Sequence, residues 1–122
     1  MPRTRALTDL ERRTIRSALV AELARTTDQA MSLAGQFDDI VAAAEMSNID
    51  DEHDPEGTTI AFERAQVSAL HSQATRDAAA LQRTLADLDD EEFGACEQCD
   101  GPIGFERLVA LPATRRCVEC AR

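Results

Sequence analysis

The chain contains no lysine, no tryptophan and no tyrosine, and only four phenylalanines among its 122 residues. A shortage of aromatic side chains disfavours a single large core or a deep pocket, and favours helices that pack along narrow seams. No run approaches the roughly 18 consecutive apolar residues of a membrane-spanning helix, and the first residues lack an apolar signal core. We therefore expect a mainly α-helical protein of the cytoplasm, without a membrane partner.

Acidic residues outnumber basic ones, with 23 Asp and Glu against 13 arginines and a formal net charge of −10. Such a charge repels nucleic acid over most of the surface, so direct sequence-specific binding to DNA or RNA is not expected. The sequence also offers no nucleophile beside a base, no glycine-rich phosphate loop and no paired buried carboxylates. An enzyme is therefore not predicted.

A first long helix is predicted to begin at a capping box, in which Thr8 and Glu11 each satisfy a backbone donor of the other. From Leu19 onward, small and apolar residues recur at alternating spacings of four and three, the rhythm of a helix in a coiled coil. Gly35 costs roughly 1 kcal/mol without ending the helix, which should run to about Met46. The predicted seam is Leu19, Leu23, Thr26, Ala30, Leu33, Phe37, Ile40 and Ala44.

Residues 47–59, SNIDDEHDPEGTT, contain five acids, a proline and a glycine and are predicted to form a turn. A second periodic run follows, so residues 19–92 should form an antiparallel two-helix coiled-coil hairpin with its tip at 47–59. Gly94 is predicted to cap the second helix, and His53 and His71 to be surface residues. Residues 1–18 should pack near the C-terminal module. The second seam is Ile60, Val67, Leu70, Ala74, Ala78, Leu81, Leu85 and Leu88.

All four cysteines lie near the C-terminus, as two Cys-x-x-Cys pairs. This spacing is typical of a four-cysteine zinc site, although a redox dithiol and disulfides are alternatives. Four protein ligands leave no open position, so one structural Zn²⁺ is expected to stabilise a small zinc finger over residues 93–122 by on the order of 10 kcal/mol. The segment 105–112 between the pairs has room for short strands. The predicted ligands are Cys96, Cys99, Cys117 and Cys120.

The strings DEEFGACEQC, IGFERL and CVEC, on a helical hairpin with an acidic turn, resemble the DksA/TraR family of bacterial transcription regulators. The resemblance covers residues 47–122 by motif and the first helix by pattern. It implies direct binding to RNA polymerase, with the hairpin inserted into the secondary channel and its tip acids near the active site. Candidate tip acids are Asp51, Asp54 and Glu56; the family pattern D-x-x-D-x-A fits in part, since Glu56 replaces the alanine.

The resemblance also bears on the alarmone ppGpp, which some members bind through basic residues beside the zinc finger. The matching positions here are Ala80, Leu111 and Ala121, none of which pairs with phosphate, so ppGpp binding through that site is not expected.

A cluster of arginines makes the zinc finger the most basic part of the chain. Its members either contact polymerase acids or balance the acidic run 87–92. The candidate polymerase contacts are Arg107, Arg115 and Arg116.

The tip acids and the helical seam also have simpler interpretations. The tip acids of residues 50–56 are also compatible with a solvated loop, and the seam with pairing between two chains, although a monomer is expected. The alternative function is a zinc-ribbon protein adaptor, or a coiled-coil dimer, with no role at polymerase.

Overall fold

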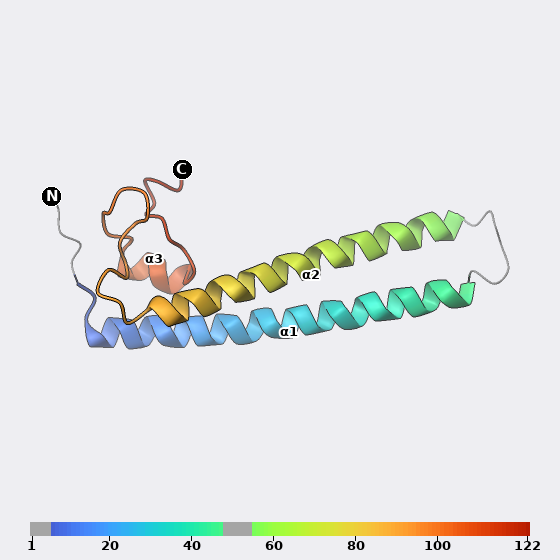
Figure 1. Cartoon of the computed structure of the whole chain (residues 1–122), viewed down its shortest axis with the longest axis horizontal. Coiled ribbons are helices and arrows are strands. Elements are labelled where there is room, and N and C mark those ends of the chain that lie inside the picture. The colour runs from blue at the N-terminus through green and yellow to red at the C-terminus, as the bar shows by residue number, and fades with distance from the viewer. Residues whose placement is uncertain (1–5, 48–54) are drawn as a thin grey trace. The chain divides into compact units, whose positions relative to one another are not determined.

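The computed structural model describes residues 6–47 and 55–122. Its helices are α1 (Asp9–Ser47), α2 (Pro55–Asp87) and the short α3 (Phe105–Ala110), in that order along the chain (Figure 1). Within these described ranges there is no strand, only an isolated bridge between Ala95 and Pro102. The mainly α-helical fold class is confirmed. None of the helices in the described ranges is long and apolar enough to span a membrane.

The chain divides into two compact units, and both long helices contribute to each. The cysteine unit comprises Met1–Ala24 and Ala79–Arg122, and the arm unit comprises Arg25–Ala78. The predicted boundary between residues 18 and 19 matches no break in the backbone, because α1 is continuous through it.

The N-terminus of α1 is the predicted capping box. The Thr8 N–H donates to Glu11 Oε1 at 3.0 Å, and the Glu11 N–H donates to Thr8 Oγ1 at 3.0 Å. These two bonds satisfy backbone donors that the helix itself leaves without a partner, so they fix where α1 begins. The prediction is confirmed at the level of individual atoms.

The predicted turn is too long at its C-terminal side. Because α2 begins at Pro55, residues 55–59 are helical rather than part of a turn. Proline suits a first helical position, since it lacks the N–H that would have no partner there and its fixed φ matches a helix. Asp51 and Asp54 lie outside the described residues, whereas Glu56 lies in the first turn of α2.

In the arm unit, α1 and α2 pack along the predicted seam, with one error. Thr26, Leu33 and Ala74 are buried, at 6%, 7% and 4% exposure. Leu70 is exposed, and the half-buried His71 takes its place in the four-three spacing, so both residues were predicted wrongly. Spacing, rather than hydrophobicity, decides the face of a helix on which a residue lies. The half-buried seam positions of this unit are Ala30, Phe37, Ile40, Ala44, Ile60, Val67, His71 and Ala78.

The cysteine unit has a denser core. Ile15, Leu19, Leu88 and Leu108 are at most 1% exposed. Fully burying side chains of this size contributes roughly 1.5–3 kcal/mol each. Two of the predicted metal ligands belong to the same cluster, so the cysteine site and the apolar core stabilise one another. The buried cluster is Ile15, Leu19, Leu81, Leu88, Cys96, Ile103, Leu108 and Cys117.

Gly94 has a different role from the predicted helix cap. α2 ends at Asp87, and the chain reaches Gly94 through successive turns, among them Phe93 N–H to Asp90 O at 3.1 Å. Gly94 has a φ of +99°, a conformation that side chains disfavour, and a Cβ there would lie 3.4 Å from Leu7 Cδ1. Glycine is needed for the turn that leads into the first cysteine pair.

α3 occupies the segment where short strands were predicted, and that prediction is wrong. Leu108 is buried, and Phe105 and Val109 pack against the same core cluster. Spacings of three and four place these three side chains on one face of a helix. A strand would send Leu108 and Val109 to opposite faces, so only a helix buries the apolar residues of this segment together.

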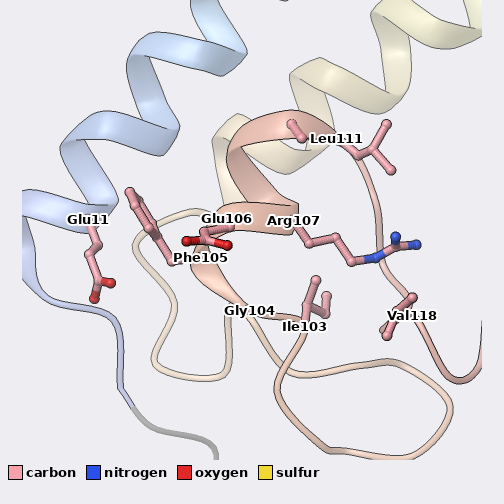
Figure 2. A pocket seen from close by; sticks show the side chains of 9 residues that line it. Glu11, Ile103, Gly104, Phe105, Glu106, Arg107, Leu111 and Val118 are labelled. Carbon is pink, nitrogen blue, oxygen red and sulfur yellow. The ribbon is translucent and has the colours of Figure 1, made fainter.

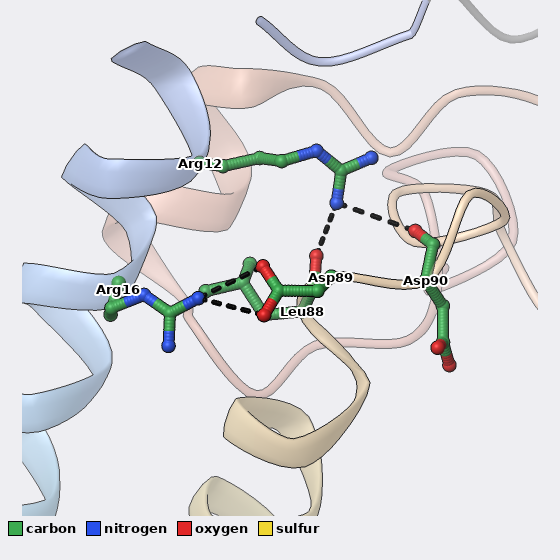
Figure 3. Close-up of polar contacts among 5 residues, drawn as sticks. All are labelled: Arg12, Arg16, Leu88, Asp89 and Asp90. Atoms are coloured by element: carbon green, nitrogen blue, oxygen red, sulfur yellow. Dashed lines mark hydrogen bonds and ion pairs between the residues drawn. The ribbon is translucent and has the colours of Figure 1, made fainter. Parts of the chain in front are cut away.

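Two arginines of α1 hold the turn that follows α2 (Figure 3). Arg12 Nη1 donates to the carbonyl oxygens of Leu88 and Asp90. Arg16 Nη2 donates to both carboxylate oxygens of Asp89, at 2.9 and 3.1 Å. These bonds satisfy carbonyl groups that lie beyond the helical ladder, and they join the start of α1 to the segment that leads to the cysteines.

Candidate metal centre

The two Cys-x-x-Cys pairs form equivalent turns. The Asp100 N–H donates to the carbonyl oxygen of Cys96 at 3.0 Å, and the Ala121 N–H donates to that of Cys117 at 3.0 Å. The first turn is bonded to the segment just before the second, because the Glu97 N–H donates to Arg115 O at 2.9 Å. The repeated sequence thus yields a repeated local fold, which presents two sulfur atoms from each side.

The first turn depends on the two residues directly after Cys99. Asp100 takes a left-handed backbone conformation, and Gly101 has no side chain. Asp100 has a φ of +61°, which aspartate tolerates better than most residues. The Gly101 N–H donates to Cys99 Sγ at 3.4 Å, and a Cβ on Gly101 would lie 3.3 Å from that sulfur. A side chain at residue 101 would therefore crowd the same Cys99 sulfur atom to which the backbone N–H of residue 101 donates.

The sulfur atoms are spaced for a metal ion rather than for disulfides. All four Sγ atoms lie within 4.8 Å of one another, and Cys99 Sγ lies 3.7 Å from Cys117 Sγ. A tetrahedral zinc ion with Zn–S bonds of about 2.3 Å separates its sulfur ligands by about 3.8 Å. A disulfide requires about 2.05 Å. The donor set and its spacing fit one Zn²⁺, and the predicted ligands are brought together.

The pKa values of the four thiols are shifted in different directions. The pKa of Cys96 is lowered to about 6, chiefly by the backbone N–H of Cys117 and also by that of Gln98. The pKa of Cys117 is likewise lowered, chiefly by the backbone N–H of Cys120. These oriented N–H groups favour the thiolate form, which is the form that binds a metal.

In the second cysteine of each pair, Cys99 and Cys120, the pKa is raised instead. At Cys99 the Gly101 N–H lowers the pKa, but the neighbouring thiols outweigh it and the pKa is raised. The pKa of Cys120 is raised to about 12, chiefly by Cys117 and then by Cys99. Four thiolates at this spacing repel one another, so a divalent cation is what makes full deprotonation favourable.

The centre is structural in type. Four sulfur ligands complete the tetrahedral coordination of zinc, so no position remains for water or substrate. Cys96 and Cys117 are buried in the core cluster, whereas Cys99 is exposed. Within the described residues, no other group of three or more Cys, His, Asp or Glu side chains lies close enough to hold an ion.

A hollow of about 790 Å³ lies beside α3 in the cysteine unit. Figure 2 shows Arg107 extending between Leu111 and Val118 on one side of it, with Phe105 toward α1 on the other. The Arg107 Nε donates to the carbonyl oxygen of Arg116 at 3.0 Å. Arg107 therefore connects α3 to the second cysteine turn.

The other two arginines predicted to contact polymerase also have internal partners. Arg115 Nη2 lies 2.8 Å from Asp87 Oδ2, and Arg116 Nε lies 3.1 Å from Glu97 Oε1. Both pairs are about half exposed, so each contributes at most about 1 kcal/mol. The Arg115 pair agrees with the charge balance against the acidic run 87–92 that the sequence left open, whereas the partner of Arg116 lies outside that run.

The positions matched to the family's ppGpp site have the following surroundings. Ala80 lines a hollow of about 370 Å³ with Arg83, Thr84 and Arg115. Leu111 lines the hollow beside α3, and Ala121 is exposed.

Sequence reasoning missed the residues that anchor the cysteine unit: Arg12 and Arg16 on α1, and Asp89 after α2. A signal was present, because two arginines one helical turn apart in α1 face the acidic run 87–92 once the two helices pair. That run had been matched only with the arginines of the zinc finger, so its partners on α1 were missed.

Comparison with known proteins identifies the cysteine segment. Residues 91–122 match the family model described as the prokaryotic dksA/traR C4-type zinc finger. The chain is similar to the RNA polymerase-binding transcription factor DksA of Escherichia coli K12, with 42% identity over 40 residues, and to that of Haemophilus influenzae, with 40% over 40. These alignments cover 33% of this chain, but only 26% and 28% of the two relatives.

The fold extends the likeness beyond the zinc finger. The transcription factor DksA2 of Pseudomonas aeruginosa has a similar structure, with a TM-score of 0.75 over 93% of this chain and 81% of that one. Sequence identity over this match is 16%. At this identity the match shows a similar fold and no more.

Proposed function

We propose that this chain regulates transcription by binding bacterial RNA polymerase directly, because its zinc finger matches the dksA/traR model and its fold is similar to that of the transcription factor DksA2. In this proposal the arm enters the secondary channel, and the tip acids Asp51, Asp54 and Glu56 act near the polymerase active site. The observation that carries the proposal is the matching zinc finger at 91–122 on a pair of long helices.

The charge of the chain favours a protein partner over nucleic acid. Five acids lie between residues 50 and 56, on a chain whose formal net charge is −10. A carboxylate cluster carried to the site of phosphoryl transfer acts on the magnesium ions or on basic side chains there. The same cluster is repelled by the phosphates of DNA.

The internal bonds of Arg107, Arg115 and Arg116 favour a structural role for these residues. We therefore expect polymerase contact to depend chiefly on the arm. The mapping of Ala80, Leu111 and Ala121 supports action without ppGpp at the family's site.

The first test is direct binding of the zinc-loaded chain to purified bacterial core polymerase, in competition with a protein known to occupy the secondary channel. We expect saturable binding that the competitor removes. No binding at micromolar concentration, with the zinc content and helical spectrum intact, would overturn the proposal and favour the adaptor function.

The second test separates docking from action at the tip. The triple variant Asp51→Asn, Asp54→Asn, Glu56→Gln should bind polymerase with the affinity of the unmodified chain, yet lose its effect on transcription in vitro. A matched control, Asp38→Asn with Asp39→Asn on the exposed face of α1, should keep both binding and effect. Full activity of the triple variant would mean that the acids are only a solvated loop.

A further inference from the structure

The chain enters the two cysteine turns in different ways. Around the first turn the bonds join backbone groups. The Cys96 N–H donates to Gly101 O at 2.7 Å, and the Ile103 N–H donates to Gly94 O at 2.9 Å. The peptide group that leads into the second turn, between residues 116 and 117, is held by side chains instead. The second turn therefore depends on side-chain identity where the first does not.

Two side chains donate to the carbonyl oxygen of this peptide group. Arg107 Nε lies 3.0 Å from Arg116 O, and Thr114 Oγ1 lies 3.2 Å from the same oxygen. Arg107 is half-buried, and Figure 2 shows its guanidinium group extended away from α3. A charged donor forms a stronger bond than a neutral hydroxyl, so Arg107 is the main partner of this carbonyl group.

The opposite side of the same peptide group faces the metal site. Its N–H belongs to Cys117, a predicted ligand, and is the chief cause that lowers the pKa of Cys96. Because a peptide group is planar, a bond that fixes the direction of its carbonyl also fixes the direction of its N–H. A charged donor on the oxygen further polarises the group and strengthens the bond that the N–H donates. One rigid group thus connects Arg107 to a cysteine of each pair.

We propose that Arg107 is a positioning residue of the metal centre, which acts through the peptide group of residues 116 and 117 and raises the affinity of the four cysteines for Zn²⁺. Thr114 assists as the second donor to the same oxygen. The inference does not depend on polymerase binding, and it gives Arg107 a role other than the polymerase contact predicted from the sequence. Groups that orient metal ligands typically change metal affinity by roughly 10- to 100-fold.

The test measures the Kd of the full chain for Zn²⁺, by competition with a chelator of known affinity. We expect Arg107→Ala to raise this Kd by ~10-fold or more, and Arg107→Lys, which keeps a charged donor, to recover most of the loss. The matched control is Arg116→Ala, which removes the same charge and an ion pair with Glu97 but keeps the carbonyl oxygen. The control should change the Kd by less than ~3-fold, because that pair is about half exposed.

Thr114→Val provides an independent test, since it keeps the shape of the side chain and removes the second donor. Alone it should raise the Kd by about 3-fold, because Arg107 still holds the oxygen. Combined with Arg107→Ala, it should weaken binding by more than the sum of the two single changes in free energy, since the carbonyl group then has neither donor. A general loosening of α3 would not couple the two substitutions.

Co²⁺ in place of Zn²⁺ separates an effect on the metal site from a general loss of structure. The absorption that arises from charge transfer between thiolate and Co²⁺ should shift in Arg107→Ala and stay unchanged in Arg116→Ala. An unchanged Kd for Zn²⁺ in Arg107→Ala, or an equal rise in Arg116→Ala, would overturn the inference. If Arg107→Ala does not fold with zinc in excess, Thr114→Val decides: a raised Kd supports the inference and an unchanged one overturns it.

Discussion

The cysteine unit and the arm unit contain parts of the same two helices, yet they are stabilised in different ways. In the cysteine unit Ile15, Leu19 and Leu88 are completely buried, and arginines bind the turn that leads to the metal ligands. Among the described residues of the arm unit, the buried side chains are Thr26, Leu33 and Ala74, each still 4–7% exposed.

The difference shows how one helical pair serves two tasks. The metal centre and core of the cysteine unit fix the register of α1 against α2 at their paired ends, with contacts that no helix makes alone. The arm unit is held by a narrow seam with few fully buried side chains. Its outer faces carry exposed acidic residues, among them Asp38 and Asp39 of α1.

Removal of the metal should give the largest difference between the units. We expect a strong chelator, or Cys117→Ser, to abolish the fixed structure of residues 93–122, because metal binding contributes on the order of 10 kcal/mol to folding. In amide NMR spectra, resonances of the zinc finger should collapse to unfolded positions. Val118→Ser, at the neighbouring exposed position, is the control and should leave the spectrum intact. A dispersed zinc-finger spectrum without metal would contradict the comparison.

Equal truncations in the two cores should have unequal costs. Leu108→Ala in the cysteine unit removes a side chain that is 1% exposed and should lower the free energy of unfolding by about 3–5 kcal/mol. Leu33→Ala in the arm, where the seam is shallower, should cost about 2 kcal/mol. Denaturant titration followed by circular dichroism measures both. Equal losses would mean that the arm is as tightly packed as the cysteine unit.

The arginine contacts should matter less than the core but more than surface charge. Arg12→Ala leaves the carbonyl groups of Leu88 and Asp90 without their donor and should cost about 1.5–3 kcal/mol. Arg13→Ala, the exposed neighbour, removes the same charge and should cost less than about 0.5 kcal/mol. Urea midpoints of the two variants decide this, and equal midpoints would reduce the Arg12 contact to a surface charge effect.

The capping box should give the smallest effect. Thr8→Ala removes the acceptor of the Glu11 N–H and should cost about 1 kcal/mol. Thr8→Ser retains a hydroxyl and should recover most of that loss. Hydrogen exchange at the first turn of α1 is the sharpest measurement, because faster exchange confined to that turn identifies a lost cap rather than a weakened core.

Where prediction from sequence succeeded, the cause was local. The start of α1 depends on atoms three residues apart, and the metal site depends on two short repeats whose spacing matches zinc coordination. In two of its failures, hydrophobicity had been given more weight than position. Leu70 was assigned to a seam that His71 occupies, and the apolar residues of α3 were assigned to strands.

The amino-acid sequence by itself determined the helical class, the capping box, most of the seam and the four metal ligands, because each follows from contacts between near neighbours or from a fixed spacing. Only the tertiary structure decided that Arg12 and Arg16 hold the turn after α2, and that the backbone at Gly94 takes a φ of +99°, which favours glycine. The arginine contacts join residues more than seventy positions apart. These residues meet only when the chain has folded back on itself, so no pattern among near neighbours in the sequence predicts the contacts.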